Sequence, residues 1–263
     1  MNCKNCDFPL QETHHYCANC GAKVIRERIS MRKLLRDFLN DFFGWDNKYL
    51  TTLTSIVTKP DVVFINYLSG VRKKYVAPFT YLAIGTAFAM LIFNFFSEEY
   101  IAVSGAMNSS EYEVINQQLG HNITPEYVEQ QRELNIKVQN FFLKYFNIIT
   151  FLLAPVFAAA TRFVFGKPYN YGEHLVITCY IQGTLFLSAI VFFILSIYTI
   201  PSLFMASSAV GVFFYLYAYG KLYRLTVGQL FVKFLKFLGI MLVAGLTIVL
   251  LGVLVGFLMS FFH

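Results

Sequence analysis

Long runs of apolar residues, separated by short polar segments, fill the chain from residue 76 onward. A membrane-spanning helix needs about 20 mostly apolar residues, and five segments approach or exceed this length: 76–97, 145–161, 175–198, 202–220 and 237–262. The second is short, but Thr124 and Pro125 favour a helix that starts outside the membrane and runs into it. The pattern predicts an all-α integral membrane protein with about five transmembrane helices.

The residues before the first span predict amphipathic helices instead. A helix is expected from Met31 to Gly44, a second from Asn47 to Thr58, and a third from Pro60 to about Gly70. Basic amphipathic helices lie on an anionic membrane surface or pack on the protein's own bundle. The bases predicted to meet the membrane surface are Arg32, Lys33, Arg36, Arg72, Lys73 and Lys74.

Three regions follow from these patterns. A zinc ribbon is predicted over residues 1–23, a cytoplasmic amphipathic helical region over 24–75, and a transmembrane helical domain over 76–263 with an outer loop at 98–144. The composition agrees, because 57% of the residues are hydrophobic and only 14% are charged, whereas about a quarter of an ordinary soluble domain is charged. No apolar run opens the chain, so no cleavable signal peptide is expected.

The N-terminal cysteines form two closely spaced pairs. Cys3 and Cys6 make one Cys-x-x-Cys knuckle, and Cys17 and Cys20 make a second. Two such knuckles suit one tetrahedral metal, which supplies the folding energy that so small a segment lacks. We expect structural zinc. Iron and a pair of disulfides are the alternatives, and His14 or His15 could replace a thiolate.

Basic residues predict the orientation in the membrane. With the N-terminus inside, the inner flanks of the spans carry nine Lys or Arg residues and the outer flanks three. Cytoplasmic loops carry the excess of Lys and Arg, and the cytoplasm also keeps thiols reduced. We therefore predict a multi-pass protein of the cell (inner) membrane with a cytoplasmic N-terminus and an external C-terminus. Nucleic-acid binding is disfavoured, because the bases alternate with a membrane-compatible apolar face.

Few polar residues interrupt the spans. Glu173 stands at the inner mouth of the third span, and His174, Thr178 and Gln182 form a stripe at intervals of four. This stripe is either a functional pocket or a set of interhelical hydrogen bonds. Asn94 and Asn147 could face it. In the last span, Gly252-x-x-x-Gly256 has the helix-dimerisation spacing and offers a homodimer contact, although we favour packing within the bundle as its explanation.

Several stretches together carry a family resemblance. They are the two cysteine knuckles, Arg28-Ile29-Ser30 with Leu34-Leu35, the segment from Tyr67 to Leu82, and Tyr169-Asn170-Tyr171-x-Glu173-His174. These resemble a family of bacterial multispan membrane proteins of unknown function. The resemblance implies a zinc ribbon joined to a membrane domain, and it implies no activity.

The sequence favours a non-enzymatic role. It contains no phosphate-binding glycine loop, zinc-protease helix or nucleophile elbow. Glu173 and His174 are adjacent, so on a helix they point about 100° apart and make a poor acid–base pair. We favour a membrane protein that uses the zinc ribbon to dock a cytoplasmic partner, in a scaffold, assembly or regulatory role. A transporter or channel component using the stripe, and a lipid enzyme using Glu173 or His174, are the competing hypotheses.

Overall fold

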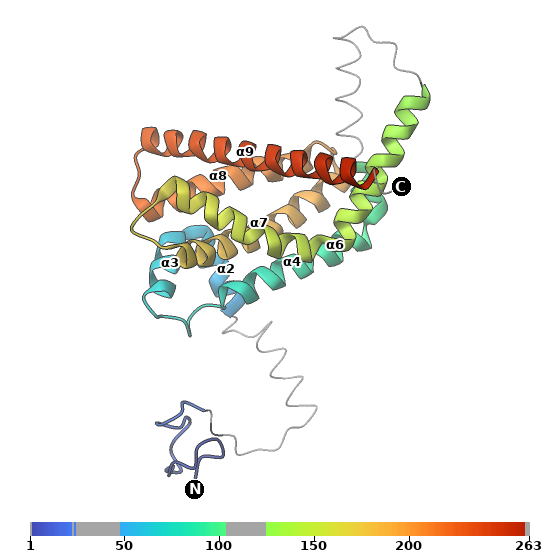
Figure 1. The fold of residues 1–263 in the computed structure, drawn as a ribbon. Coiled ribbons are helices and arrows are strands. Elements are labelled where there is room, and N and C mark those ends of the chain that lie inside the picture. Colours follow the sequence, from blue (N-terminus) through green and yellow to red (C-terminus); the bar gives the residue numbers. More distant parts are fainter. Residues whose placement is uncertain (1, 23, 25–47, 104–124, 261–263) are drawn as a thin grey trace. The chain divides into compact units, whose positions relative to one another are not determined.

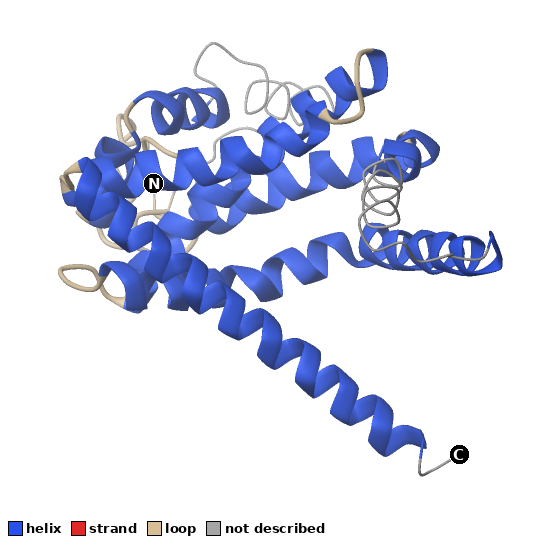
Figure 2. Cartoon of the chain, turned by 90° about the horizontal axis from the view of Figure 1, so that it is seen from above, coloured by secondary structure: helices blue, strands red, loops and turns tan. Residues whose placement is uncertain are grey.

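A computed structural model describes residues 2–22, 24, 48–103 and 125–260. The chain divides into two compact units, Met1–Asn47 and Lys48–His263. In the described residues all regular elements are α-helices, apart from an isolated β-bridge between Asn2 and Pro9 (Figure 2). The helices of the second unit, labelled in Figure 1, are α2 (Lys48–Thr58), α3 (Pro60–Leu68), α4 (Pro78–Phe95), α6 (Pro125–Phe165), α7 (Tyr171–Tyr198), α8 (Leu203–Tyr223) and α9 (Val227–Ser260).

Four helices in the described part of the chain are long and apolar enough to cross a membrane. They are α4, α6 from Glu129 onward, α7 and α8. The fifth expected span lies within α9, much of whose side-chain environment is outside the described residues. α6 is one helix that begins at Pro125, as the sequence predicts.

Some helix boundaries differ from the expected ones. α7 begins at Tyr171 rather than at residue 175, because the Asn170 side chain accepts a hydrogen bond from the backbone N–H of Glu173 and caps the helix. α9 begins at Val227, ten residues before the expected start at residue 237. Its first turns carry Lys233 and Lys236, so the helix extends beyond the purely apolar segment.

α7 is the central helix of the second unit. It contacts α4, α6 and α8, as well as α2 and α3. Ile177, Tyr180 and Ile181 of α7 are fully buried in the main apolar core. In the contact between α7 and α4, Tyr81 and Thr184 share a hydrogen bond of 2.9 Å. The fold therefore surrounds the polar stripe on α7 with other helices.

The described amphipathic helices pack on the bundle. Ile56 of α2 and Val63 of α3 are fully buried in the same core as α7. The backbone N–H of Val76 donates to Thr52 Oγ1 at 3.0 Å, and Tyr217 of α8 donates to the carbonyl of Thr58 at 2.7 Å. The sequence left open whether these helices lie on the membrane surface or pack on the bundle, and α2 and α3 pack on the bundle. The helix expected from Met31 to Gly44, with Arg32, Lys33 and Arg36, lies outside the described residues.

Candidate functional site

The four N-terminal cysteine sulfurs form one compact cluster. All four Sγ atoms lie within 4.8 Å of one another. Cys3 Sγ is 3.7 Å from Cys20 Sγ, and Cys6 Sγ is 3.6 Å from Cys17 Sγ. A tetrahedron of metal–sulfur bonds of about 2.3 Å has edges of about 3.8 Å, whereas a disulfide joins sulfurs at about 2.05 Å. The four thiols could thus hold a metal ion, and all are free of disulfides.

Two knuckles with the same backbone geometry create this cluster. In the first, Cys3 N–H donates to Phe8 O at 2.9 Å and Asp7 N–H donates to Cys3 O at 2.8 Å. The second knuckle has the same two bonds at the same spacings. Cys17 N–H donates to Ala22 O at 2.8 Å, and Gly21 N–H donates to Cys17 O at 2.9 Å. The fourth residue after each first cysteine has a positive φ, 56° at Asp7 and 70° at Gly21. Each tight turn aims its two sulfurs at the other pair.

Amide groups surround the sulfurs. The backbone N–H of Asn5 donates to Cys3 Sγ at 3.4 Å, and the Asn19 side chain donates to Cys6 Sγ at 3.7 Å. Hydrogen bonds from the Asn5 side chain and the Ala22 backbone lower the pKa of the Cys20 thiol to about 6. The hydrogen bond with the Phe8 backbone lowers the pKa of the Cys6 thiol, but contacts with Cys20, Cys17 and Cys3 and its burial outweigh that bond and raise this pKa to about 11. The amide donors favour the thiolate form, which is the form that binds metal.

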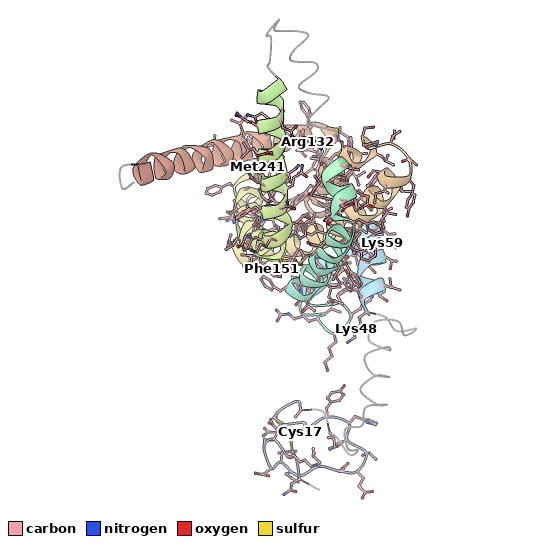
Figure 3. All side chains as sticks on the ribbon, turned by 90° about the vertical axis from the view of Figure 1, so that its right-hand side faces the viewer. Cys17, Lys48, Lys59, Arg132, Phe151 and Met241 are labelled. Carbon is pink, nitrogen blue, oxygen red and sulfur yellow. The ribbon has the colours of Figure 1, made fainter. Side chains whose placement is uncertain are left out.

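The cluster has few apolar neighbours to hold it together. Among the described residues its buried core consists of Cys3, Leu10 and Cys17, with Cys6, Ala22 and Val24 packed against it, and Cys17 is labelled in Figure 3. His14 and His15 are not among the residues that form the metal-binding group. Instead, His14 Nδ1 accepts from the Gln11 N–H at 3.4 Å. The remaining cysteine, Cys179, is buried in α7 among Leu82 and Ala154.

His174, the first residue of the polar stripe, is fully buried and bonded on both sides of its ring. Its Nδ1 lies 3.1 Å from Thr161 Oγ1 and 3.3 Å from the Tyr219 hydroxyl. Its Nε2 lies 3.1 Å from the Tyr223 hydroxyl, which donates to Gly166 O at 3.0 Å. A neutral imidazole satisfies this set, with Nε2 donating and Nδ1 accepting. His174 therefore joins α7 to α6 and α8.

The other residues of the predicted pocket separate into two groups. Glu173 belongs to the cap of α7, because its carboxylate accepts from the Asn170 N–H at 2.6 Å. Thr178 is fully buried and Gln182 is 8% exposed. Thr178 Oγ1 and Gln182 Oε1 have no partner in good hydrogen-bond geometry, although their side chains lie close to Tyr219 and Tyr215 respectively. The structure does not bring the two expected asparagines to the stripe. Asn94 donates to Met90 O at 2.8 Å, and Asn147 donates to Met90 Sδ at 3.2 Å.

A cavity that the sequence analysis did not identify opens beside Gln182. Its volume is about 400 Å³, and residues of α6, α7, α8 and α9 line it. Tyr219, which bonds His174, separates the two sites. Ser207 and Gly211, two small residues four apart on α8, line this cavity together with Tyr215. The spacing of small residues and tyrosines on α8 was the available sequence signal.

The remaining predicted site residues are exposed on the surface or lie outside the described residues. Arg72, Lys73 and Lys74 are exposed in the turn between α3 and α4. The Arg72 guanidinium lies over the Tyr67 ring at 5.7 Å. The surroundings of Gly252 and Gly256, the predicted homodimer contact, lie outside the described residues.

Comparison with known proteins gives one match. Residues 46–90, which form α2, α3 and most of α4, match a family described as a protein of unknown function (DUF3667). No curated protein and no solved structure matches the chain. The match and the cysteine cluster fit a family without an established function that has a possible metal site.

Proposed function

We propose that the protein is a non-enzymatic integral membrane protein whose N-terminal unit is a zinc-stabilised docking module for a cytoplasmic protein. The observation that carries this proposal is the close grouping of the Cys3, Cys6, Cys17 and Cys20 sulfurs, at separations that suit one tetrahedral metal ion. Four protein ligands complete the coordination of zinc and leave no position for a substrate, as in structural sites. The metal therefore organises a surface.

The module has an exposed apolar surface that suits docking. Phe8 is 38% exposed and Tyr16 is 53% exposed, although both are large rings. Aromatic residues are enriched where proteins bind each other. Tyr16 directly precedes the second knuckle and Phe8 lies two residues after the first, so folding around zinc fixes the position of both rings.

The buried stripe supports a structural role for the membrane domain. Both nitrogens of His174 are occupied by side chains from neighbouring helices, and Glu173 completes the cap of α7. A transport route needs polar groups that can exchange partners with water or a solute. We therefore propose anchoring and assembly as the task of this domain, with the N-terminus inside the cell.

Elemental analysis of the purified full-length protein tests the metal centre. We expect one zinc per chain, and a serine at any one of the four cysteine positions should reduce the zinc content. Cys179→Ser is the matched control and should keep it, because Cys179 lies in α7. Iron in place of zinc, or equal loss in the control, would contradict the proposal.

In-cell photocrosslinking tests the docking role. A crosslinker at Phe8 should capture a protein partner in the native chain and lose it in Cys17→Ser, while Cys179→Ser keeps the crosslink. Capture that survives Cys17→Ser would refute a zinc-organised surface. Solute uptake by proteoliposomes that depends on His174 would instead support the transporter hypothesis.

A further inference from the structure

The cavity between α6, α7, α8 and α9 is lined by polar residues at some points and by apolar residues along most of its length. On α8, the residues Ser207, Gly211, Tyr215 and Tyr219 line it at intervals of four, so one face of this helix forms a wall. Twelve residues at 1.5 Å each give a wall of about 18 Å. This length is close to one leaflet of the hydrocarbon core, which is about 30 Å thick in total.

The walls are mostly apolar and reach the outside of the bundle. Leu153, Val212 and Leu238 line the cavity and are each more than a third exposed. In a bilayer these exposed side chains meet lipid, so hydrocarbon can enter from the side. The volume of about 400 Å³ lies within the usual range of ligand pockets, roughly 300–1,000 Å³.

The ammonium group of Lys233 lies at one end of the cavity. Lys233 Nζ donates to the carbonyl of Val164, in the last turn of α6, at 2.5 Å. An ammonium group has three donors, so two remain for another partner. None of the residues that line the cavity is acidic. Arg162, in the last turn of α6, adds positive charge at this end.

Unsatisfied polar groups lie about one helical turn deeper than this end. Tyr215 precedes Tyr219 by four residues, or about 6 Å along α8. The Tyr215 hydroxyl and Gln182 Oε1 are buried atoms without a partner in good hydrogen-bond geometry, although the two side chains lie close enough to interact weakly. Buried polar groups are normally paired. A hydroxyl donor at this depth suits the ester carbonyl of a lipid whose phosphate lies at Lys233.

We propose that this cavity binds an acidic phospholipid, with the phosphate at Lys233, an ester carbonyl at Tyr215 and an acyl chain along the α8 wall. The order of charge, hydrogen-bond donor and apolar wall matches the order of groups in the lipid. The proposal is independent of zinc binding and of the docking role, because every residue concerned belongs to the second unit.

Native mass spectrometry of the delipidated full-length protein in a nonionic detergent tests the headgroup. The probes are dioleoyl phosphatidylglycerol and dioleoyl phosphatidylcholine, which share their acyl chains. We expect one retained phosphatidylglycerol and a preference over phosphatidylcholine of about fivefold, the contribution of one basic residue near an anionic surface. Lys233→Gln should abolish the preference and Lys233→Arg should keep it. Lys236→Gln, on the same helix but outside the cavity lining, should leave it unchanged.

Two further variants test the cavity itself. Gly211→Leu adds bulk inside the cavity and should reduce retention of both lipids, whereas Gly245→Leu places the same side chain where nothing lies within 4 Å. Tyr215→Phe should weaken phosphatidylglycerol binding. Equal binding of the two lipids by the native chain, equal losses in Lys233→Gln and Lys236→Gln, or a lipid-free dimer with this face covered would each overturn the proposal. If Gly211→Leu does not fold, the lysine and tyrosine variants decide the question.

Discussion

Gly85 of α4 faces Gly183 of α7 so closely that a Cβ atom added to Gly85 would lie 2.8 Å from the Gly183 carbonyl oxygen. A Cβ atom added to Gly183 would lie 2.7 Å from the Tyr81 ring. Small residues allow membrane helices to approach in this way, and association then depends on van der Waals packing. Here the close approach also lets Tyr81 reach Thr184.

Gly85→Ala should therefore destabilise the membrane domain. The added methyl group meets backbone and cannot be accommodated by a rotamer change, so we expect a loss of about 1–3 kcal/mol. The measurement is thermal unfolding of the full-length protein in detergent. Gly239→Ala is the control, because nothing lies within 4 Å of its added Cβ. Equal destabilisation by both variants would show that the α4–α7 contact is looser than described.

Substitutions at two positions of the buried stripe, His174 and Thr178, should change the stability of the membrane domain to different extents. His174→Ala removes the partner of Thr161, Tyr219 and Tyr223 and leaves a cavity, so we expect a loss of about 2–3 kcal/mol. Thr178→Val removes a buried hydroxyl that meets the Tyr219 side chain outside good hydrogen-bond geometry, so the change should be small, within about 1 kcal/mol. Unfolding in detergent measures both. A stable His174→Ala variant would contradict the bridging role.

The sequence predicted the helices of this fold better than the contacts between them. The apolar runs show where α4, α6, α7 and α8 lie, because lipid requires long uninterrupted helices. The cysteine spacing likewise identifies the thiols that cluster. Asn170-x-x-Glu173 has capping-box spacing, so the capping role of Glu173 was also readable.

Residue pairs far apart in the sequence were not predictable. His174 meets Tyr219 and Tyr223 across 45 and 49 residues, and a single sequence does not show how two helices are rotated relative to each other. The cavity was unpredictable for the same reason, because its shape depends on how four helices are rotated against one another. From the sequence, Lys233 counted only as one of the nine basic residues on the inner flanks of the spans, although it lies at the end of that cavity.

The two knuckles predict opposite effects at equivalent turn positions. Gly21 adopts a φ of 70°, which costs an ordinary residue about 1–2 kcal/mol. Because metal binding and folding are coupled, Gly21→Ala should weaken zinc affinity about tenfold. Asp7→Gly should strengthen it, since Asp7 already has a φ of 56°. Competition with a zinc chelator measures both affinities, and Asp7→Asn is the conservative control. Stronger binding by Gly21→Ala would rule out this turn geometry.

Metal removal should unfold only the first unit. The core around Cys3, Leu10 and Cys17 is too small to remain folded without metal, whereas the second unit has its own core. After chelation we expect protease cleavage within residues 2–22 and unchanged thermal unfolding of the membrane domain. Parallel loss of both would show that the two units are energetically coupled.

Two serine positions should lie on opposite sides of the membrane. Ser69 precedes α4, and Ser202 lies between α7 and α8, so three helices of the described residues that are long and apolar enough to span lie between them. An odd number of crossings reverses the side, and the basic flanks predict that Ser69 is inside. With a membrane-impermeant maleimide, Ser202→Cys should be labelled in intact cells and Ser69→Cys only after lysis, above the wild-type background. Labelling of Ser69→Cys alone would reverse the orientation. Equal labelling of both before lysis would mean that α4, α6 and α7 do not all cross, and lipid would then not be the solvent around α7.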